Sequence, residues 1–272
     1  MVSWDPSTYA RFAAERRRPF TDLVARLEVA EPRRVVDLGC GPGDLTAWLA
    51  RRWESADVVG VDTSPRMIER AQGEASADDV SGRLSFELGD LADWRPTEPG
   101  SVDVVVTNAA LQWVPGHLDL LPTLVGHLAP GGSLALQVPG NFDAPSHALM
   151  REVAAEPAFA PLLDGVLRGG DSVAELTTYA ALLADLGCQV DAWETTYAHV
   201  LDAEGRFGED AVLAWVSGTG LRPVMDALEP EPTLRQAFLD TYAERLRAAY
   251  PRRPWGTLLP FRRLFCIARR SS

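Results

Sequence analysis

The chain has 272 residues, a formal net charge of −12 at pH 7 and a hydrophobic fraction of 46%. This length allows one large α/β domain or a domain with a substantial insertion. The acidic balance argues against nucleic-acid binding, and no apolar run approaches the ~20 residues of a membrane span. Three cysteines without paired spacing indicate neither a disulfide framework nor a metal site. We therefore expect a cytoplasmic protein without a signal peptide, a metal or a membrane partner. The oligomeric state stays open, and a monomer is plausible.

The N-terminal segment is expected to be helical. Residues 20–27 repeat their apolar side chains at helical spacing, and Pro19 suits the first turn of that helix. Residues 7–18 predict a separate short helix. This arm either docks on the rest of the chain or closes over a ligand. The second alternative is considered because Tyr9 and Arg16 could lie on one face of the helix.

From residue 34, strands and helices alternate. The expected strands cover residues 34–39, 58–62, 84–88, 102–107 and 133–138. The expected helices between them cover residues 44–53, 65–75 and 117–127. Pro130, Gly131 and Gly132 predict a turn before the fifth strand. Such a βαβ series indicates a mostly parallel sheet with right-handed crossovers.

The second half of the chain interrupts this alternation. Its expected helices cover residues 146–155, 174–186, 209–217 and 231–249, and its expected strands cover 188–201 and 259–270. The predicted organisation is an N-terminal arm (1–30), an α/β core (31–204, with an insertion at 139–172), a helical cap (205–256) and a last core strand (257–272).

Polar residues follow four of the predicted parallel strands. Asp37 and Gly39 close the first strand, and Asp62, Asp90 and Asn108 follow the second, third and fourth. Ligands of open parallel sheets bind at the carboxyl ends of the strands. One such acid is often only a helix cap, but four polar strand ends together predict a ligand site.

The glycine loop after the first strand selects the type of ligand. Nicotinamide enzymes carry Gly-x-Gly-x-x-Gly/Ala and seat a pyrophosphate on the helix start. Here the glycines are Gly39, Gly41 and Gly43, and the sixth position is Asp44, which would repel a pyrophosphate. Asp37 adds a second negative charge. The loop therefore favours a ligand with an ammonium group and no phosphates.

The next two strand ends complete the prediction. Asp62 is placed to accept both hydroxyls of a ribose, and Asp90 with the backbone of Leu91 can bind an adenine amino group and ring nitrogen. Met67 either packs on the adenine or belongs to the core. An amino acid joined to adenosine without phosphate describes S-adenosylmethionine (SAM).

These residues resemble the class I SAM-dependent methyltransferases. The matching stretches are Asp37 to Gly43, Asp62 to Ser64, Gly89 to Leu91 and Asn108 to Trp113. The resemblance implies a Rossmann-like, mostly parallel seven-stranded sheet with an antiparallel last strand and a helical substrate cap. The expected SAM-binding residues are Asp37, Gly39, Gly41, Asp62, Thr63, Met67, Asp90, Leu91, Asn108 and, from the arm, Arg16.

Further stretches are similar to the trans-aconitate 2-methyltransferase family. They are Trp4 to Tyr9, Ala14 to Arg16, Leu111 to Pro115, Leu149 to Val153, Thr195 to Tyr197, Thr219 to Pro223 and Arg263 to Phe265. The resemblance spans essentially the whole chain. It implies a small polycarboxylate acceptor, and monomethyl ester and S-adenosylhomocysteine as products.

A carboxylate acceptor needs no general base, because its pKa near ~4 leaves it ionised at neutral pH. No catalytic residue is therefore assigned, and holding the reactants together can supply roughly 7–11 kcal/mol. Two arginines, three neutral side chains and one arm residue are the expected acceptor contacts: Arg222, Arg263, Tyr197, Gln112, Trp113 and Tyr9. Arg16 is an alternative acceptor contact. Cys40, His117, His147 and His199 are interpreted as structural.

Three alternatives remain. The chain is an O- or N-methyltransferase for another acceptor, such as a natural-product hydroxyl or amine. It is a non-catalytic SAM-binding regulatory protein. The last alternative, a nicotinamide dehydrogenase, is disfavoured by Asp44.

Overall fold

The structure is a computed structural model that describes residues 12–77, 79–169 and 172–271. It divides into two compact units, and neither is contiguous in the chain. The first, here called the sheet unit, comprises residues 14–139, 173–194 and 263–272. The second, here called the helical unit, comprises residues 1–13, 140–172 and 195–262. The arm, core and cap boundaries expected from the sequence remain predictions.

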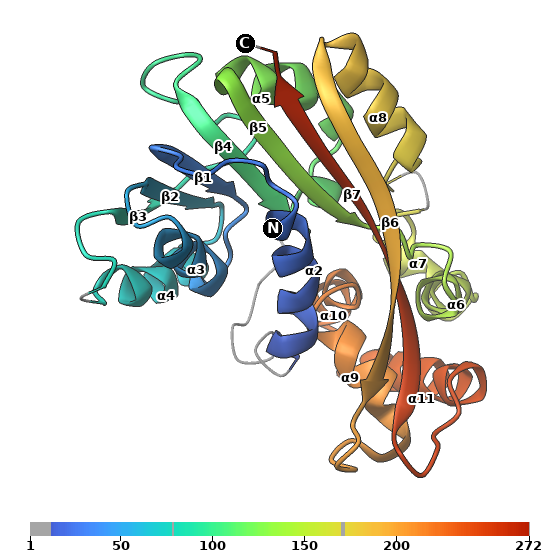
Figure 1. The fold of residues 1–272 in the computed structure, drawn as a ribbon. Coiled ribbons are helices and arrows are strands. Elements are labelled where there is room, and N and C mark those ends of the chain that lie inside the picture. The colour runs from blue at the N-terminus through green and yellow to red at the C-terminus, as the bar shows by residue number, and fades with distance from the viewer. Residues whose placement is uncertain (1–11, 78, 170–171, 272) are drawn as a thin grey trace. The chain divides into compact units, whose positions relative to one another are not determined.

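Seven strands form one sheet in the order β3-β2-β1-β4-β5-β7-β6 (Figure 1). They are β1 (Arg34–Leu38), β2 (Asp57–Asp62), β3 (Leu84–Leu88), β4 (Val102–Asn108), β5 (Leu128–Pro139), β6 (Cys188–Leu201) and β7 (Thr257–Arg270). Strands β1 to β5 pair in parallel, and β7 pairs antiparallel with β5. This topology confirms the predicted fold class.

Apart from α2, α7 and α10, the helices follow the predicted ranges closely. They are α2 (Ala13–Ala25), α3 (Asp44–Arg52), α4 (Pro65–Ala75), α5 (Leu121–His127), α6 (Pro145–Ala154), α7 (Ala160–Leu163), α8 (Leu176–Asp185), α9 (Ala211–Ser217), α10 (Arg222–Ala227) and α11 (Pro232–Ala249). Single 3-10 turns are η1 (Leu111–Trp113), η2 (His117–Leu120) and η4 (Gly208–Asp210). The sequence did not predict α7 or α10. None of the described helices is long and apolar enough to cross a membrane.

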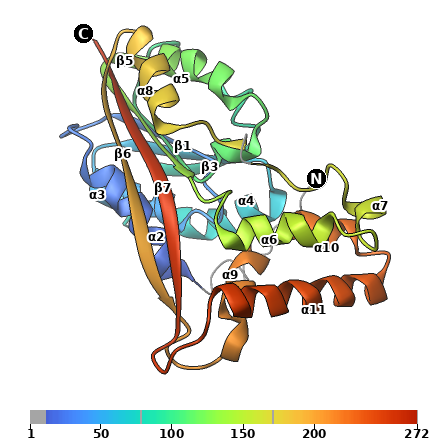
Figure 2. The same ribbon diagram turned by 90° about the vertical axis from the view of Figure 1, so that its right-hand side faces the viewer.

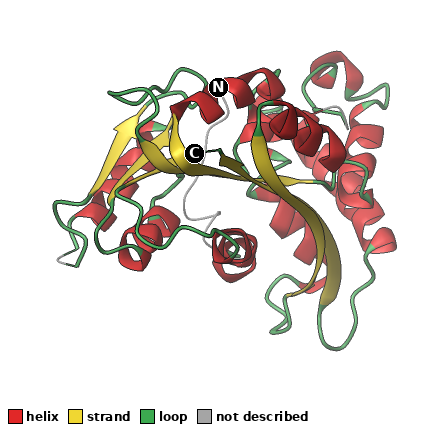
Figure 3. Cartoon of the chain, turned by 45° about the horizontal axis from the view of Figure 1, so that its top comes forward, coloured by secondary structure: helices red, strands yellow, loops and turns green. Residues whose placement is uncertain are grey.

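Helices cover both faces of the strands in the sheet unit (Figure 3). Side chains alternate between the two faces of a strand. Val36 and Leu38 of β1 belong to the core cluster that also contains the buried residues of α5 and α8. Asp37, between them, accepts a hydrogen bond from Thr46 of α3. The α5–α8 face of β1 therefore packs into this apolar cluster, and the α3 face carries the polar contact of Asp37.

Helix α2 corrects the prediction of two helices separated at Pro19. It runs unbroken from Ala13 to Ala25 with Pro19 inside. A proline in a helix interior removes one backbone hydrogen bond and costs about 3 kcal/mol or more. Phe20 and Leu23, which are fully buried, offset that cost through apolar burial.

Strand β5 starts earlier than its sequence predicted. Leu128 pairs with Val102, and regular pairing resumes at Ser133 opposite Val104. The expected turn at residues 130–132 is therefore an irregularity within the strand. The proline and glycines do mark an interruption of the ladder, but pairing exists on both sides of it.

The helical unit has its own apolar core. Trp215 of α9, Phe238 and Tyr242 of α11 and the outer halves of β6 and β7 contribute to it. Helices α6 and α11 lie side by side (Figure 2). The Tyr242 hydroxyl donates to the carbonyl of Ser146, which holds the start of α6. Phe12 packs on Trp215 with ring centroids 5.0 Å apart.

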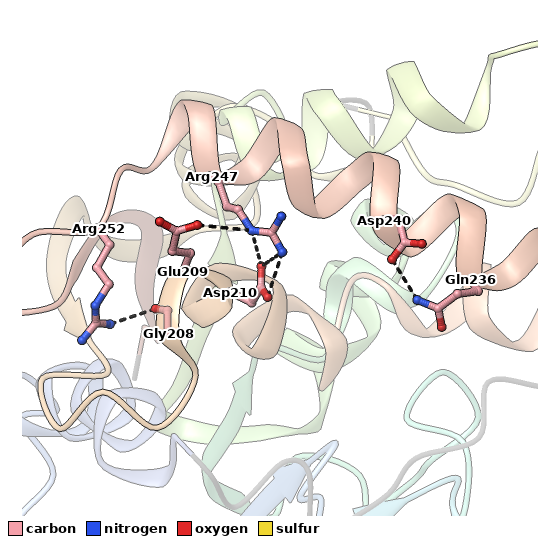
Figure 4. A network of polar contacts seen from close by, with 7 residues as sticks. All are labelled: Gly208, Glu209, Asp210, Gln236, Asp240, Arg247 and Arg252. Carbon is pink, nitrogen blue, oxygen red and sulfur yellow. Dashed lines mark hydrogen bonds and ion pairs between the residues drawn. The ribbon is translucent and has the colours of Figure 1, made fainter.

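A polar network ties the end of α11 to the loop before α9. The Asp202 side chain is 1% exposed and pairs with Arg252 at 3.1 Å. Arg252 also donates to the carbonyl of Gly208 at 2.8 Å, whereas Arg247 pairs with the exposed Asp210 (Figure 4). The first pair is buried on its acidic side, and the second is screened by solvent.

Replacing Arg252 and Arg247 one at a time separates the contributions of the two ion pairs to the free energy of unfolding. Arg252→Ala leaves the buried Asp202 carboxylate without its cation and should lower the free energy of unfolding by about 3 kcal/mol. Arg247→Ala removes an exposed pair and should cost less than about 1 kcal/mol. Urea unfolding followed by circular dichroism measures both. Equal midpoints for the two variants would contradict this ranking.

Candidate functional site

The carboxyl ends of the central strands meet at one edge of the sheet. Leu38 is level with Val61, and Asp37 is level with Val106 two residues before Asn108. Asp62 is level with Leu88 at the end of β3. The polar residues that follow these strands therefore come from adjacent positions along the same edge, as the sequence predicted.

The glycine loop crosses this edge in close contact with its neighbours. The amide nitrogens of Gly39 and Cys40 donate to the carbonyl of Val61 at 2.8 and 3.0 Å. Gly39 has φ +83°, and a Cβ there would lie 2.3 Å from Cβ of Ala110. Only glycine satisfies both the backbone conformation and this approach.

Asp62 fastens the loop from the second strand. One carboxyl oxygen accepts from the amide of Gly41 at 2.9 Å, and the other accepts from the amide of Ser64 at 2.9 Å. Partial burial raises the pKa of Asp62, and these backbone donors counter the rise. Each oxygen keeps a second lone pair, so the carboxylate can still accept from a ligand. Thr63 beside it is exposed.

Asp37 lies deeper than its neighbours. Its side chain is 3% exposed, and one oxygen accepts from the Thr46 hydroxyl at 2.7 Å. Burial raises the pKa of Asp37 to about 7, and the charges of Asp62 and Asp44 add to the rise. The carboxyl group is thus poised to lose its proton when a cation approaches.

The remaining predicted cofactor residues differ in exposure. The Asp90 carboxylate accepts from the amide of Ala92 at 2.9 Å and is exposed, while Leu91 is buried in the sheet-unit core. Met67 is 4% exposed. The side-chain oxygen of Asn108 is buried and has no hydrogen-bond partner among the described residues. Asn108 therefore offers an unused acceptor at the strand edge.

Three predicted acceptor residues belong to the sheet unit. Arg263 is 6% exposed, pairs with Pro139 at the carboxyl end of β5, and donates to the side-chain oxygen of Gln137 at 3.4 Å. Gln112 is buried and donates to the carbonyl of Ala109 at 2.6 Å. Trp113 ends η1 and is half-buried.

The other predicted acceptor residues belong to the helical unit or to the arm. Arg222 begins α10, and its Nε is buried without a hydrogen-bond partner among the described residues. Tyr197 is 2% exposed and stacks on His199, with ring centroids 5.9 Å apart. Tyr9 and the side chain of Arg16 lie outside the described part of the chain, so their predicted contacts remain predictions.

Two polar side chains at the site were not predicted. Thr46, on the buried face of α3, donates a hydrogen bond to Asp37. Gln137, within β5, accepts a hydrogen bond from Arg263. Gln137 had a sequence signal, because it interrupts the apolar run from Leu134 to Val138. Thr46 had none, since a threonine on a helix is ordinary.

Comparison with known proteins now identifies the family. Residues 35–132 match a methyltransferase domain model. A trans-aconitate 2-methyltransferase of Streptomyces coelicolor is 54% identical over 270 residues, which covers 98% of this chain and 87% of that relative. The chain belongs to the trans-aconitate 2-methyltransferase family. A relative of the same name from Streptomyces avermitilis is 48% identical over 99% of this chain and 98% of its own length. The resemblance predicted from the sequence is confirmed.

The fold alone is less specific than the family. The solved structure of the cyclase SpnF aligns with a TM-score of 0.60 over 100% of this chain and 88% of that chain, at 15% identity. Identity this low shows a common fold and nothing of the reaction. Membership of the trans-aconitate 2-methyltransferase family therefore rests on the sequence relatives.

The burial of Asp37 predicts that Asp37→Asn stabilises the folded chain by an amount that depends on pH. Wild-type Asp37 keeps its proton up to about pH 7 in the folded chain, whereas the unfolded chain releases it near the ordinary value of 3.8. The folded state therefore loses stability as pH rises from about 4 to 7. Without ligand, the free energy of unfolding of Asp37→Asn should exceed that of the wild type by about 4 kcal/mol at pH 8 and match it near pH 4.

Urea midpoints measured across this pH range test the effect. Asp57→Asn, which replaces an exposed acid at the start of β2, is the control and should follow the wild type throughout. A difference between Asp37→Asn and the wild type that does not change with pH would contradict the raised pKa.

Proposed function

We propose that this chain transfers the methyl group of SAM to a carboxylate of trans-aconitate, giving a monomethyl ester and S-adenosylhomocysteine. The observation that carries the proposal is the 54% identity, over 98% of the chain, to a relative named for this reaction. The residues of the glycine loop independently indicate the same methyl donor.

The sheet unit supplies groups of the right kind for SAM. Asp62 has lone pairs left for the two ribose hydroxyls after binding the amides of Gly41 and Ser64. Asp37 offers a carboxyl whose negative charge is stabilised by an ammonium group. Asp44 at the helix start disfavours phosphates. Asp90 with the Leu91 backbone is assigned to the adenine.

The acceptor chemistry fits a site without a general base. A carboxylate is already ionised at neutral pH, so its oxygen attacks the methyl carbon directly as the sulfonium sulfur leaves with its electron pair. The protein must hold the two reactants aligned, which can supply roughly 7–11 kcal/mol. Cationic side chains must at the same time bind the acceptor's other carboxylates.

Arg222 and Arg263 are the proposed carboxylate partners. The buried Nε of Arg222 is a donor without a partner in the described structure, and an unmet buried donor is costly unless a ligand satisfies it. Arg263 is a buried guanidinium at the carboxyl end of β5 and donates a hydrogen bond to the neutral side chain of Gln137. Gln112, Trp113, Tyr197 and Tyr9 remain proposed as neutral contacts.

Incubation with SAM and trans-aconitate tests the reaction, with the ester detected by mass spectrometry. The expected result is one added methyl group on trans-aconitate and stoichiometric S-adenosylhomocysteine. Turnover confined to phenols or amines would assign another acceptor. SAM binding without turnover on any acceptor would assign a regulatory protein.

Removing the Asp62 carboxylate should weaken SAM binding. Asp62→Ala removes the ribose acceptor and should raise the Kd for SAM roughly 10-fold or more, because a hydrogen bond to a charged group is lost. Isothermal titration with S-adenosylhomocysteine and its 2′-deoxy analogue separates two roles of Asp62. One is the proposed contact with the ribose, and the other is the hydrogen bonding that holds the glycine loop. Wild-type protein should prefer the ribose form and the variant should not. An unchanged preference would remove the ribose assignment.

Removing either arginine should weaken acceptor binding and spare SAM. Arg222→Ala and Arg263→Ala should each raise the KM for trans-aconitate roughly 10-fold or more, because each loses a charge-assisted hydrogen bond. The Kd for SAM should stay within about twofold. Arg247→Ala, an exposed arginine with an acidic partner, is the matched control. Unaltered kinetics in both variants would refute the proposed carboxylate contacts.

A further inference from the structure

Two glycines leave room for the ring of Phe86, which lies on β3 in the sheet unit. In the register of the sheet, Gly60 of β2 is level with Asp37 of β1 on one side and with Phe86 on the other. Residues that are level on neighbouring strands point to the same face of a sheet. Phe86 therefore belongs to the face on which Asp37 contacts α3.

The first glycine, Gly60, provides space for two side chains. A Cβ on Gly60 would lie 2.6 Å from Cδ1 and 2.7 Å from Cε1 of Phe86, closer than real Cβ atoms come to other atoms. The same Cβ would lie 3.0 Å from Cβ of Cys40 in the glycine loop. Gly60 has no positive φ, so its backbone conformation does not require glycine. The ring of Phe86 and the side chain of Cys40 therefore share the space over this residue.

The tip of the ring reaches the second glycine, Gly43, which is the N-cap of α3. A Cβ on Gly43 would lie 2.7 Å from Cζ of Phe86 and 2.7 Å from Cβ of Ala71 on α4. The ring therefore extends from β3 across β2 to the start of α3. Its tip and Ala71 together confine the backbone of Gly43.

Hydrogen bonds connect Gly43 to the rest of the glycine loop. Its amide donates to the carbonyl of Cys40 at 3.3 Å, and its carbonyl accepts from the amide of Ala47 in α3 at 2.8 Å. The amide of Gly41, between them, donates to Asp62. Helix α4 packs against both β3 and α3 (Figure 1). A displacement of the ring would therefore be transmitted to residues 40–43.

Ordinary core packing does not account for these two glycines. Phe86 is half-buried and belongs to neither of the two large apolar clusters, so it removes less apolar surface from water than a core phenylalanine does. A glycine within a strand, such as Gly60, weakens that strand. The chain thus accepts a weaker β2 in exchange for a ring that contacts the glycine loop.

We propose that Phe86 is a positioning residue for the glycine loop, and that its ring holds residues 40–43 in the conformation that binds SAM. This rests on the proposed function, because it takes the assignment of the loop to the cofactor as its starting point. Phe86 acts through the loop and is assigned no contact with SAM or with the acceptor. A loop that is held in its bound conformation costs less to order when the ligand binds, so the ring acts on cofactor affinity.

Isothermal titration of folded variants with S-adenosylhomocysteine tests the role of the ring. Phe86→Ala should raise the Kd roughly 10-fold or more, because the loop must then be ordered during binding. The KM for trans-aconitate, and kcat at saturating SAM, should stay within about twofold of the wild type. Leu84→Ala is the matched control, since Leu84 lies on the same face of β3 and is 5% exposed. It should lower the urea midpoint and leave the Kd unchanged. A Phe86→Ala variant with a lower urea midpoint and a wild-type Kd would overturn the proposal.

A double-mutant cycle with Gly60→Ala tests the shared space directly. In the wild-type background the new methyl group meets the ring and should raise the Kd for S-adenosylhomocysteine roughly fivefold. In the Phe86→Ala background the ring is absent, so the same methyl group should change the Kd by less than about twofold. The same Kd ratio in both backgrounds would show that the ring and Gly60 act independently, and would overturn the proposal.

Phe86→Leu decides the question if Phe86→Ala does not fold. Leucine keeps carbon atoms beside Gly60 but lacks the Cζ that reaches Gly43, so the Kd should rise about threefold or more. An unchanged Kd would overturn the proposal. Wild-type protein that binds S-adenosylhomocysteine without methylating trans-aconitate would refute the proposed acceptor, and the Kd series would still decide on Phe86. Wild-type protein that does not bind S-adenosylhomocysteine would refute the assignment of the loop to the cofactor, and the role of Phe86 with it.

Discussion

The glycine loop after β1 passes over the start of the loop after β4 only because residue 39 has no side chain. A methyl group there would overlap the side chain of Ala110, and the positive φ of Gly39 disfavours other residues. This one approach lets the amides of Gly39 and Cys40 pair with Val61. It also presents the amide of Gly41 to Asp62. The positions of the proposed ribose acceptor and of the loop therefore depend on each other, and both depend on the parallel register of β1 with β2.

The proposed division of labour follows the chemistry of the two substrates. The groups assigned to SAM lie in the sheet unit, where strand ends and a helix start supply backbone donors and carboxylates. The charged groups assigned to the acceptor are arginines, as a polyanion requires. Arg222 belongs to the helical unit, while Arg263 is the first residue of β7 that belongs to the sheet unit. A single strand thus carries one proposed acceptor contact into the unit to which the cofactor contacts are assigned.

The parts that the sequence predicted are those set by local patterns. A short apolar run followed by an acid placed Asp62 and Asp90 at strand ends, because a parallel sheet ends its strands at one edge. The parts that it did not predict depend on distant contacts. Helix α2 continues through Pro19 because tertiary burial outweighs a local penalty. The hydrogen bond from Thr46 to Asp37 joins a helix to a strand, and no spacing rule connects the two residues. Family membership supplied the acceptor, which the cofactor loop cannot specify.

Strand β7 has a consequence for how the chain reaches this structure. Residues 133–139 of β5 pair with residues 263–269, which are synthesised about 130 residues later. Until then one edge of β5 has no partner strand, although β1 to β4 can already pair. Contacts so distant in sequence slow folding, and an unpaired apolar edge invites association with other chains. A chain truncated before β7 would therefore aggregate through the unpaired edge of β5, although its glycine loop could still form. The fourteen residues of β7 thus cover the edge of β5, whereas the five parallel strands lie within about the first half of the chain.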